Sequence, residues 1–398
     1  MTVLIDNQLS LLIELLTPYV NVVGFEGRTS DASSVAALRD QIIHHGAEAI
    51  VVRSTTNVGN ALLDGTRVRF VVTATAGVDH VDIAYLAQRG IEFASAQGSN
   101  ANAVADYVML AIDVWRDSAG KSPTDLTIGI VGYGNIGRRL AHHAGTAGMR
   151  VLVCDPPHAT SIENADSQQS FVDLRTLVVA SDIVSLHVPL TRTGVHATAN
   201  LFDCTYISAM NAGALLVNTS RGGIVDESAL KDRLETRGIE SVLDVYNNEP
   251  AIDVLVASAA LISTPHIAGY TIESRTNITR SAGKALLHWL GVSFSDFERA
   301  LSMASPSGFN ERNLVEETAI MRDALRNKSA IDVFDMLRKS HVLRNERLCD
   351  PYADNKIGLP VTYRVEKKLL LSIVILRSRK HTDHRGYFLS LIHISEPT

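Results

Sequence analysis

A buried strand that runs straight into a glycine-rich turn constrains the fold of this chain more than any other feature. Residues 126–131 (Leu-Thr-Ile-Gly-Ile-Val) are mostly apolar, as expected for a strand covered on both faces. Gly132, Gly134 and Gly137 follow in the spacing G-x-G-x-x-G, and residues 138–141 favour a helix. In a dinucleotide site such glycines allow a tight turn, close approach to a pyrophosphate and close helix–strand packing. The pyrophosphate then lies at the helix N-terminus, where unpaired N–H groups and the helix dipole favour an anion.

The next expected strand ends on an acidic residue, which separates a dinucleotide site from an ordinary glycine-rich turn. Residues 150–154 favour a strand, and Asp155 follows it directly, about 20 residues beyond the glycines. A carboxylate at this point accepts hydrogen bonds from the adenosine ribose and repels a 2′-phosphate. The sequence therefore predicts dinucleotide binding, with NAD preferred over NADP.

Short apolar runs alternate with amphipathic segments over the first 300 residues, and this rhythm predicts an α/β fold. Expected strands before the glycine turn lie at 3–6, 20–25, 49–55, 68–75 and 91–95. Those after it lie at 150–155, 182–190, 214–220, 241–245 and 261–264. A long helix is expected at 100–117. We therefore predict two doubly wound parallel-sheet domains with a cleft at the carboxyl ends of their strands.

Composition narrows the class of protein. The chain has 398 residues, 46% of them hydrophobic, and a formal net charge of −6, which disfavours nucleic acid or an anionic membrane as a partner. Three cysteines without metal or disulfide spacing suit a reducing compartment. The first residues do not have the pattern of a signal peptide, and no apolar run is long enough to span a bilayer. We expect a cytoplasmic protein.

Three polar residues lie at or just beyond the ends of expected strands. Arg221 can hold a carboxylate with two hydrogen bonds and polarise a neighbouring carbonyl. His266 can take up or return a hydroxyl proton, because imidazole titrates near neutral pH. Glu249 lies one helix-plus-strand unit before it and can fix the imidazole tautomer. Each residue alone has a structural role as its alternative, but together they favour oxidation of an alcohol.

Four further segments complete the pattern of a known family. They are VRSTTNV at 52–58, TATAGVDHVD at 73–82, CDPP at 154–157 and HIAGYT at 266–271. Over about residues 1–300 the chain resembles the D-isomer-specific 2-hydroxyacid dehydrogenases. The threonine-rich loop, CDPP and HIAGYT are typical of the branch that serves pyridoxal phosphate biosynthesis. The resemblance implies NAD-dependent oxidation of the C2 hydroxyl of 4-phospho-D-erythronate, a small phosphorylated 2-hydroxy acid, to the 2-oxo acid.

The resemblance also assigns roles to residues. Arg221 would hold the substrate carboxylate, and Glu249 would orient His266, which exchanges the proton. Contacts to NAD would come from Gly132, Gly134, Asn135, Ile136, Gly137, Asp155, Thr219, Asp244 and Gly269. Substrate contacts would come from Ser54, Thr75 and Tyr270, and Arg53 is the first candidate for the phosphate. No metal is expected, since Asp79-His80-Val81-Asp82 has no partner cluster.

The family fold implies a discontinuous arrangement of domains. Residues 1–98 and 270–300 would form a flavodoxin-like substrate-binding domain, with the Rossmann NAD-binding domain at 99–269 inserted in it. Hinges are expected near 98–102 and 269–272. Residues 301–350 resemble part of a C-terminal dimerisation domain, and 351–398 is expected to include a non-native tail. We expect a homodimer, weakened if the C-terminus is truncated.

One residue departs from the pattern of the branch, and two alternative functions remain compatible with the sequence. Val188 stands where the branch often has threonine, so one hydrogen bond to NAD is expected to be missing. The histidine pairs at 44–45 and 142–143 are expected to be solvated. The alternatives are another D-2-hydroxyacid dehydrogenase, acting for example on 3-phosphoglycerate, or an NAD-binding regulator without turnover.

Overall fold

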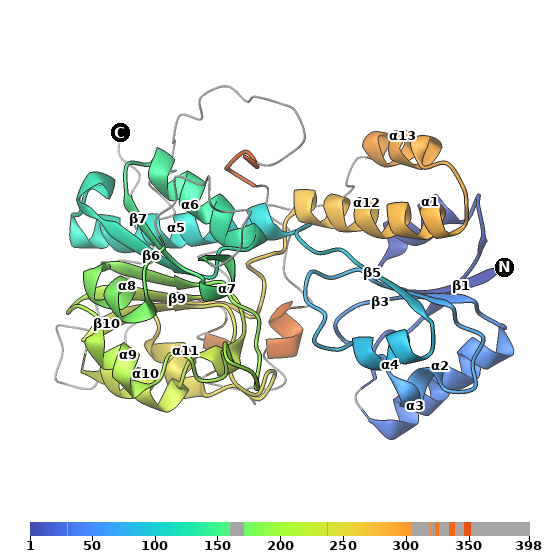
Figure 1. The fold of residues 1–398 in the computed structure, drawn as a ribbon, viewed down its shortest axis with the longest axis horizontal. Coiled ribbons are helices and arrows are strands. Elements are labelled where there is room, and N and C mark those ends of the chain that lie inside the picture. The colour runs from blue at the N-terminus through green and yellow to red at the C-terminus, as the bar shows by residue number, and fades with distance from the viewer. Residues whose placement is uncertain are drawn as a thin grey trace.

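The structure is a computed structural model that describes residues 1–29, 31–159, 171–236, 238–304, 319, 321, 323–325, 334–338 and 346–351. Two α/β domains lie side by side in Figure 1, each built on its own parallel sheet. The predicted fold class is therefore confirmed. Among the described residues, no helix is long and apolar enough to cross a membrane.

The first domain is built on a five-stranded sheet in the order β2-β1-β3-β4-β5. Its strands are β1 (Thr2–Asp6), β2 (Asn21–Phe25), β3 (Ala49–Val52), β4 (Phe70–Thr73) and β5 (Glu92–Ser95), and all neighbours pair in parallel. One face packs against α2 (Ala32–His44), α3 (Asn60–Leu63) and α4 (Ile83–Gln88). The other face packs against α1 (Ser10–Leu16), α12 (Ile272–Trp289) and α13 (Ser295–Met303). Two helices from late in the chain thus complete the first domain.

The second domain has a six-stranded sheet in the order β11-β10-β9-β8-β6-β7. Its strands are β6 (Thr127–Val131), β7 (Arg150–Cys154), β8 (Ile183–Leu186), β9 (Ala214–Asn218), β10 (Ile239–Leu243) and β11 (Ile262–Ser263). One face packs against α5 (Ala101–Ala119) and α6 (Asn135–Thr146). The other packs against α8 (Leu174–Ala180), α9 (Cys204–Ala209), α10 (Glu227–Glu235) and α11 (Val254–Ala259), and the short α7 (Pro156–Ala159) follows β7. This order reverses between β6 and β8, which is where such sheets bind ligands.

Several strands end earlier than the sequence predicts, most clearly β3 and β8, and the residues released from the sheet form loops. β3 ends at Val52, after which Arg53 turns back to form an ion pair with Asp6 (Nε to Oδ2, 2.9 Å). β8 ends at Leu186, shortly before Pro189, which has no N–H to donate to a sheet. The apolar runs marked the strands correctly, but their polar ends belong to loops.

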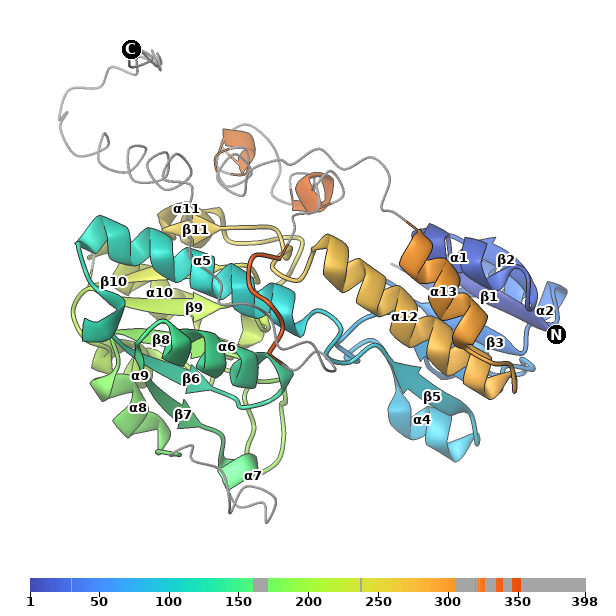
Figure 2. The same cartoon turned by 90° about the horizontal axis from the view of Figure 1, so that it is seen from above.

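The chain crosses between the domains at two places that lie together. α5 and α12 begin close to one another at the junction and run apart into different domains (Figure 2). The hydroxyl group of Ser99, at the first crossing, lies 3.0 Å from that of Ser281 in α12.

The described parts of residues 319–351 pack largely against the second domain. Met321, Leu325 and Phe334 are buried in the core beneath α10 and α11, and Leu348 is buried in the core beneath α5 and α6. The predicted tail beyond Pro351 lies outside the described residues.

The expectation of solvated histidines is wrong for His143. This side chain is buried between α5 and α6, where its Nε2 lies 3.1 Å from the Asn102 side-chain oxygen. Burial lowers the pKa of His143 to about 4, so the ring is neutral near pH 7.

Candidate active site

The three predicted catalytic residues lie on loops that follow adjacent strands. β9, β10 and β11 are neighbours in the second sheet and run parallel, so their carboxyl ends share one edge. Arg221 follows β9, Glu249 follows β10 and His266 follows β11. The topology therefore places all three at one edge of the sheet.

Glu249 and His266 form a direct pair. Glu249 Oε2 lies 2.8 Å from His266 Nδ1, and its other oxygen accepts a hydrogen bond from the Tyr246 N–H at 2.9 Å. Burial alone raises the pKa of Glu249, but His266 and the hydrogen bonds outweigh burial and hold that pKa below its ordinary value. An ionised Glu249 keeps the His266 proton on Nδ1, which leaves Nε2 to exchange a proton with a ligand.

The loop that carries His266 is fixed by a buried carboxylate. Asp244 is 1% exposed, and its oxygens accept hydrogen bonds from the Thr264 hydroxyl (2.6 Å), the Ile267 N–H (2.7 Å) and the Ala268 N–H (2.9 Å). The His266 N–H donates to the Asp244 carbonyl at 2.8 Å. His266 itself has φ 59°, a left-handed conformation uncommon outside glycine. These bonds hold the strained backbone and so aim the imidazole.

Arg221 is held from the other domain. Its Nε and Nη2 lie 3.0 and 2.7 Å from Asp79 Oδ2, and its Nη1 donates to the Ser220 carbonyl at 2.7 Å. A Cβ on Gly77 would overlap Arg221 Nη2, so only glycine permits this approach. The sequence considered Asp79 only as a metal ligand and missed this contact; no motif links residues so far apart.

The predicted substrate residues lie on three different loops. Thr75 donates to the Gly77 carbonyl at 3.0 Å and shares a hydrogen bond with Thr73, which also contacts His80. Burial lowers the pKa of His80 to about 4, so this network is neutral. Ser54 is exposed beside Arg53, and Tyr270 lies on the His266 loop. Thr75 thus lies next to the contact between Gly77 and Arg221, and Tyr270 lies on the His266 loop, whereas Ser54 lies on a separate loop after β3.

The glycine turn has the geometry of a dinucleotide site. Gly132 has φ 96°, and its N–H donates to the Cys154 carbonyl at 2.9 Å. A Cβ on Gly137 would overlap the Gly132 carbonyl, which explains the close packing of α6 on β6. Asn135 and Ile136 open α6, whose N-cap Gly134 offers no side chain to cap the first N–H groups. Those N–H groups are available to an anion.

The other predicted cofactor residues surround this turn. Asp155 accepts hydrogen bonds from the N–H groups of Tyr133 (2.7 Å) and His158 (3.0 Å), which hold its carboxylate at the end of β7. Thr219 has a buried hydroxyl without a partner among the described residues. Buried polar atoms normally have one, so this hydroxyl fits a bound ligand. A Cβ on Gly269 would overlap the Asn100 side chain at the crossing between the domains.

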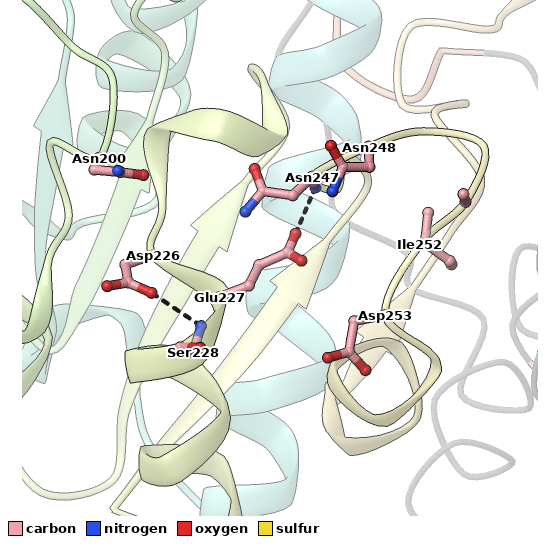
Figure 3. A pocket seen from close by; sticks show the side chains of 9 residues that line it. Asn200, Asp226, Glu227, Ser228, Asn247, Asn248, Ile252 and Asp253 are labelled. Atoms are coloured by element: carbon pink, nitrogen blue, oxygen red, sulfur yellow. Dashed lines mark hydrogen bonds between the residues drawn. The ribbon is translucent and has the colours of Figure 1, made fainter.

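A separate polar pocket lies behind the Glu249 loop, lined by residues 200, 226–228, 247–248 and 251–253 (Figure 3). Asp226, Glu227 and Asp253 make its wall acidic, which does not suit an anionic substrate or cofactor. Glu227 accepts a hydrogen bond from the Asn247 N–H at 2.6 Å, drawn as a dashed line in Figure 3. This hydrogen bond helps to hold the loop that carries Glu249. Within the described residues, no group of three or more potential ligands could hold a metal ion.

Sequence comparisons identify relatives of the chain. Residues 102–268 match the family described as D-isomer specific 2-hydroxyacid dehydrogenase, NAD binding domain. The erythronate-4-phosphate dehydrogenase of Chromohalobacter salexigens is 40% identical over 293 residues, which cover 73% of each chain. That of Sodalis glossinidius is 37% identical over 378 residues, covering 90% of this chain and 96% of the relative.

Solved structures share the fold. TT0316 protein from Thermus thermophilus superposes with a TM-score of 0.60 at 26% identity, covering 74% of this chain and 98% of that one. D-lactate dehydrogenase from Aquifex aeolicus, complexed with NAD and lactic acid, gives a TM-score of 0.61 at 24% identity, covering 75% and 97%.

Glu227 is expected to make stability depend on pH. Burial raises the pKa of Glu227 from its ordinary 4.5 to about 7, so the folded protein holds a proton that the unfolded chain releases between these values. The free energy of unfolding should therefore fall as pH rises through this window, by roughly 1–3 kcal/mol in total, since solvent reaches part of the carboxyl group and weakens the effect. Glu227→Gln cannot ionise and should remove this slope. Urea unfolding at several pH values measures it.

The matched control is Glu235→Gln, at the exposed end of the same helix, which should keep the slope. A slope that persists unchanged in Glu227→Gln would show that another group causes it.

Proposed function

The chain belongs to the D-isomer specific 2-hydroxyacid dehydrogenase family, and we propose that it oxidises the C2 hydroxyl of 4-phospho-D-erythronate with NAD. The relatives named erythronate-4-phosphate dehydrogenase give the substrate, and the product is the corresponding 2-oxo acid, 2-oxo-3-hydroxy-4-phosphobutanoate. That name also places the reaction in pyridoxal phosphate biosynthesis. The observation that carries the proposal is the 2.8 Å contact between Glu249 and His266, which lie on the loops after β10 and β11, next to the loop that carries Arg221 after β9.

His266 is proposed as the proton acceptor. As the C2 hydroxyl becomes a carbonyl, its proton passes to His266 Nε2, because Nδ1 is engaged by Glu249. Glu249 stabilises the imidazolium that results and fixes the ring orientation. NAD, when bound, supplies the acceptor for the hydrogen that leaves C2 with its electron pair.

Arg221 is proposed to hold the substrate carboxylate. Asp79 accepts hydrogen bonds from Nε and Nη2 of Arg221, so the guanidinium is already oriented before a ligand binds. Next to the C2 carbonyl that forms, its charge stabilises the developing negative charge on oxygen. Ser54, Thr75 and Tyr270 are proposed to contact the remainder of the substrate.

The residues around the glycine turn suit NAD. The open N-terminus of α6, with Gly132, Gly134, Asn135, Ile136 and Gly137, would hold the diphosphate. Asp155 would accept hydrogen bonds from the ribose, and the Thr219 hydroxyl, which has no partner among the described residues, suits a cofactor contact. Asp244 and Gly269 would border the nicotinamide. Val188 packs near Gly132 and offers no hydroxyl, so the chain lacks a hydrogen bond there.

The domain arrangement also forms part of the proposal. Residues 1–98 and 270–300 would bind the substrate and 99–269 the NAD, supported by the packing of α12 and α13 on the first sheet. The cleft would close by movement at 98–102 and 269–272. We further propose a cytoplasmic homodimer, since three cysteines without disulfide spacing suit a reducing compartment and residues 301–350 resemble a dimerisation region.

The first test compares substrates. The protein should form NADH with 4-phospho-D-erythronate at a kcat/KM roughly 100-fold or more above that with 3-phosphoglycerate, because a site built for one pattern of polar groups rejects another. His266→Ala should lower kcat by roughly 10²–10⁴ and leave NAD binding unchanged. Absorbance of NADH measures kcat and kcat/KM, and calorimetry measures NAD binding.

A preference for 3-phosphoglycerate would assign the chain to a different reaction of the same family. NAD binding without NADH from any 2-hydroxy acid would instead favour a regulator, and near wild-type turnover in His266→Ala would exclude the proton-transfer role.

The second test concerns cofactor choice. Asp155→Asn keeps a hydrogen-bond acceptor but removes the negative charge that faces the ribose. The ratio of kcat/KM for NADP to that for NAD should rise roughly 10-fold or more, because repulsion of the 2′-phosphate is lost. Steady-state kinetics with both cofactors measure this ratio. Asp173→Asn, which caps α8, is the control and should leave it unchanged.

The third test concerns Arg221. Gly77→Ala places a methyl group where Arg221 Nη2 lies, so the guanidinium must move. The KM for substrate should rise roughly 10–100-fold, the range for a lost charge-assisted hydrogen bond, while the melting temperature changes little. Gly145→Ala in α6, where a Cβ meets nothing within 4 Å, is the matched control. An unchanged KM in Gly77→Ala would contradict the role of Arg221 in substrate binding.

A further inference from the structure

Arg338 links residues 334–338 to the catalytic loops. Its Nε donates to the Tyr270 hydroxyl at 3.3 Å, and its guanidinium carbon lies 5.8 Å from the centre of the Tyr270 ring. Phe334 is buried against Tyr246 on the Glu249 loop, with ring centroids 6.0 Å apart. Asp335 reaches the first domain through an ion pair with Arg28 at 2.7 Å. This segment therefore contacts both domains beside the site.

Arg275 approaches the same loop from α12. It is the fourth residue of that helix, five residues after Tyr270, and its Nη2 donates to the Gln8 carbonyl at 3.4 Å. The Gln8 N–H donates to Asp6, whose other oxygen accepts from Arg53 at 2.9 Å. A short chain of hydrogen bonds thus joins Arg275 to Arg53.

Arg275 lies beside a second arginine, whereas Arg338 faces the negative charges of Glu249 and Asp244, which help to raise its pKa. Arg53 has Asp6 as its partner, but among the described residues no carboxylate lies within ion-pair distance of Arg275 or Arg338. Burial and the nearby positive charge of Arg53 lower the pKa of Arg275, because the two like charges repel one another. Arg275 also lies near the positive end of the α12 dipole, an unfavourable place for a cation. Such an arrangement is stabilised by an anion.

We propose that Arg275, Arg338 and Arg53 form the subsite for the substrate phosphate, with Tyr270 between them. This rests on the proposed function, which supplies a substrate with a phosphate two carbons from the reacting C2. A phosphate monoester has a charge of about −1.5 to −2 at pH 7, and Arg275 and Arg338 have no carboxylate within ion-pair distance among the described residues. Planar guanidinium groups match phosphate oxygens well. Residues 334–338 would thereby form part of the active site.

The test compares phosphorylated and unphosphorylated substrates. In Arg338→Ala and Arg275→Ala the KM for 4-phospho-D-erythronate should rise roughly 10–100-fold, as expected for a lost charge-assisted hydrogen bond, while kcat changes little. The KM for D-erythronate, which lacks the phosphate, should stay as in the wild type. Arg299→Ala, an exposed arginine of α13 paired with Asp296, is the matched control and should alter neither.

A second measurement does not depend on turnover. Inorganic phosphate should compete with 4-phospho-D-erythronate in the wild type, and calorimetry should show weaker phosphate binding in both variants. Circular dichroism checks that the variants fold, and Arg338→Lys and Arg275→Lys, which keep the charge, should recover part of the affinity. If the wild type fails to oxidise 4-phospho-D-erythronate, the proposed function is wrong, but loss of phosphate binding in the variants still supports the subsite.

Two results would overturn the subsite. One is an unchanged KM and unchanged phosphate binding in both variants. The other is an equal loss of kcat on both substrates, which would show that Arg338 acts on Glu249, whose charge it faces, rather than on phosphate.

Discussion

The buried carboxylate of Asp244 is the interaction on which the catalytic edge depends. A carboxylate removed from water is costly, and burial raises the pKa of Asp244, yet three donors from residues 264–268 replace the lost water. These donors come from the loop that carries His266, so the bonds that satisfy Asp244 also hold His266 at φ 59°. Asp244 directly follows β10, and the chain continues from it into the Glu249 loop. Acid and base are therefore tied to the end of one strand, which is how a strained histidine keeps a 2.8 Å contact with its glutamate.

A second constraint operates between the domains. Arg221 belongs to the domain with the glycine turn, whereas Asp79 belongs to the other. The Asp79 side chain is 52% exposed, so this ion pair contributes little to stability. Its effect is on orientation, since it fixes a guanidinium at the place where the domains meet. The state of the cleft and the direction of Arg221 are thus coupled, and a substrate carboxylate meets a group that is already aimed.

The sequence predicted those parts of the site that follow from local patterns and topology. The glycine spacing, Asp155 and the strand ends that carry Arg221, Glu249 and His266 have signatures in short windows, and parallel strands bring such ends together. Contacts between distant segments have no such signature. Asp79 was considered only as a metal ligand, and no sequence pattern indicated a role for Glu227. His143 was expected in solvent because nothing in its own helix shows that Asn102 of α5 covers it. Asp244 was assigned to the cofactor by resemblance, and only the fold reveals that both of its oxygens are engaged by the chain.

Different charged groups are proposed to serve the reaction and the choice of substrate. Arg221 is balanced by Asp79, Arg53 by Asp6, and His266 faces Glu249, so each of these groups has a partner before any ligand binds. Other 2-hydroxy acids also have a carboxylate and a C2 hydroxyl, and therefore these pairs alone do not select a phosphorylated one. Arg275 and Arg338 are different, because the described residues offer them no carboxylate in ion-pair range. Arg338 also belongs to a segment beyond the two domains, and this segment contacts the first through Arg28 and the second through Tyr246. A dianionic group bound there would link Arg275 of the first domain to residues 334–338, which pack on the second domain through Phe334. Recognition of the phosphate and closure of the cleft would then depend on the same contacts.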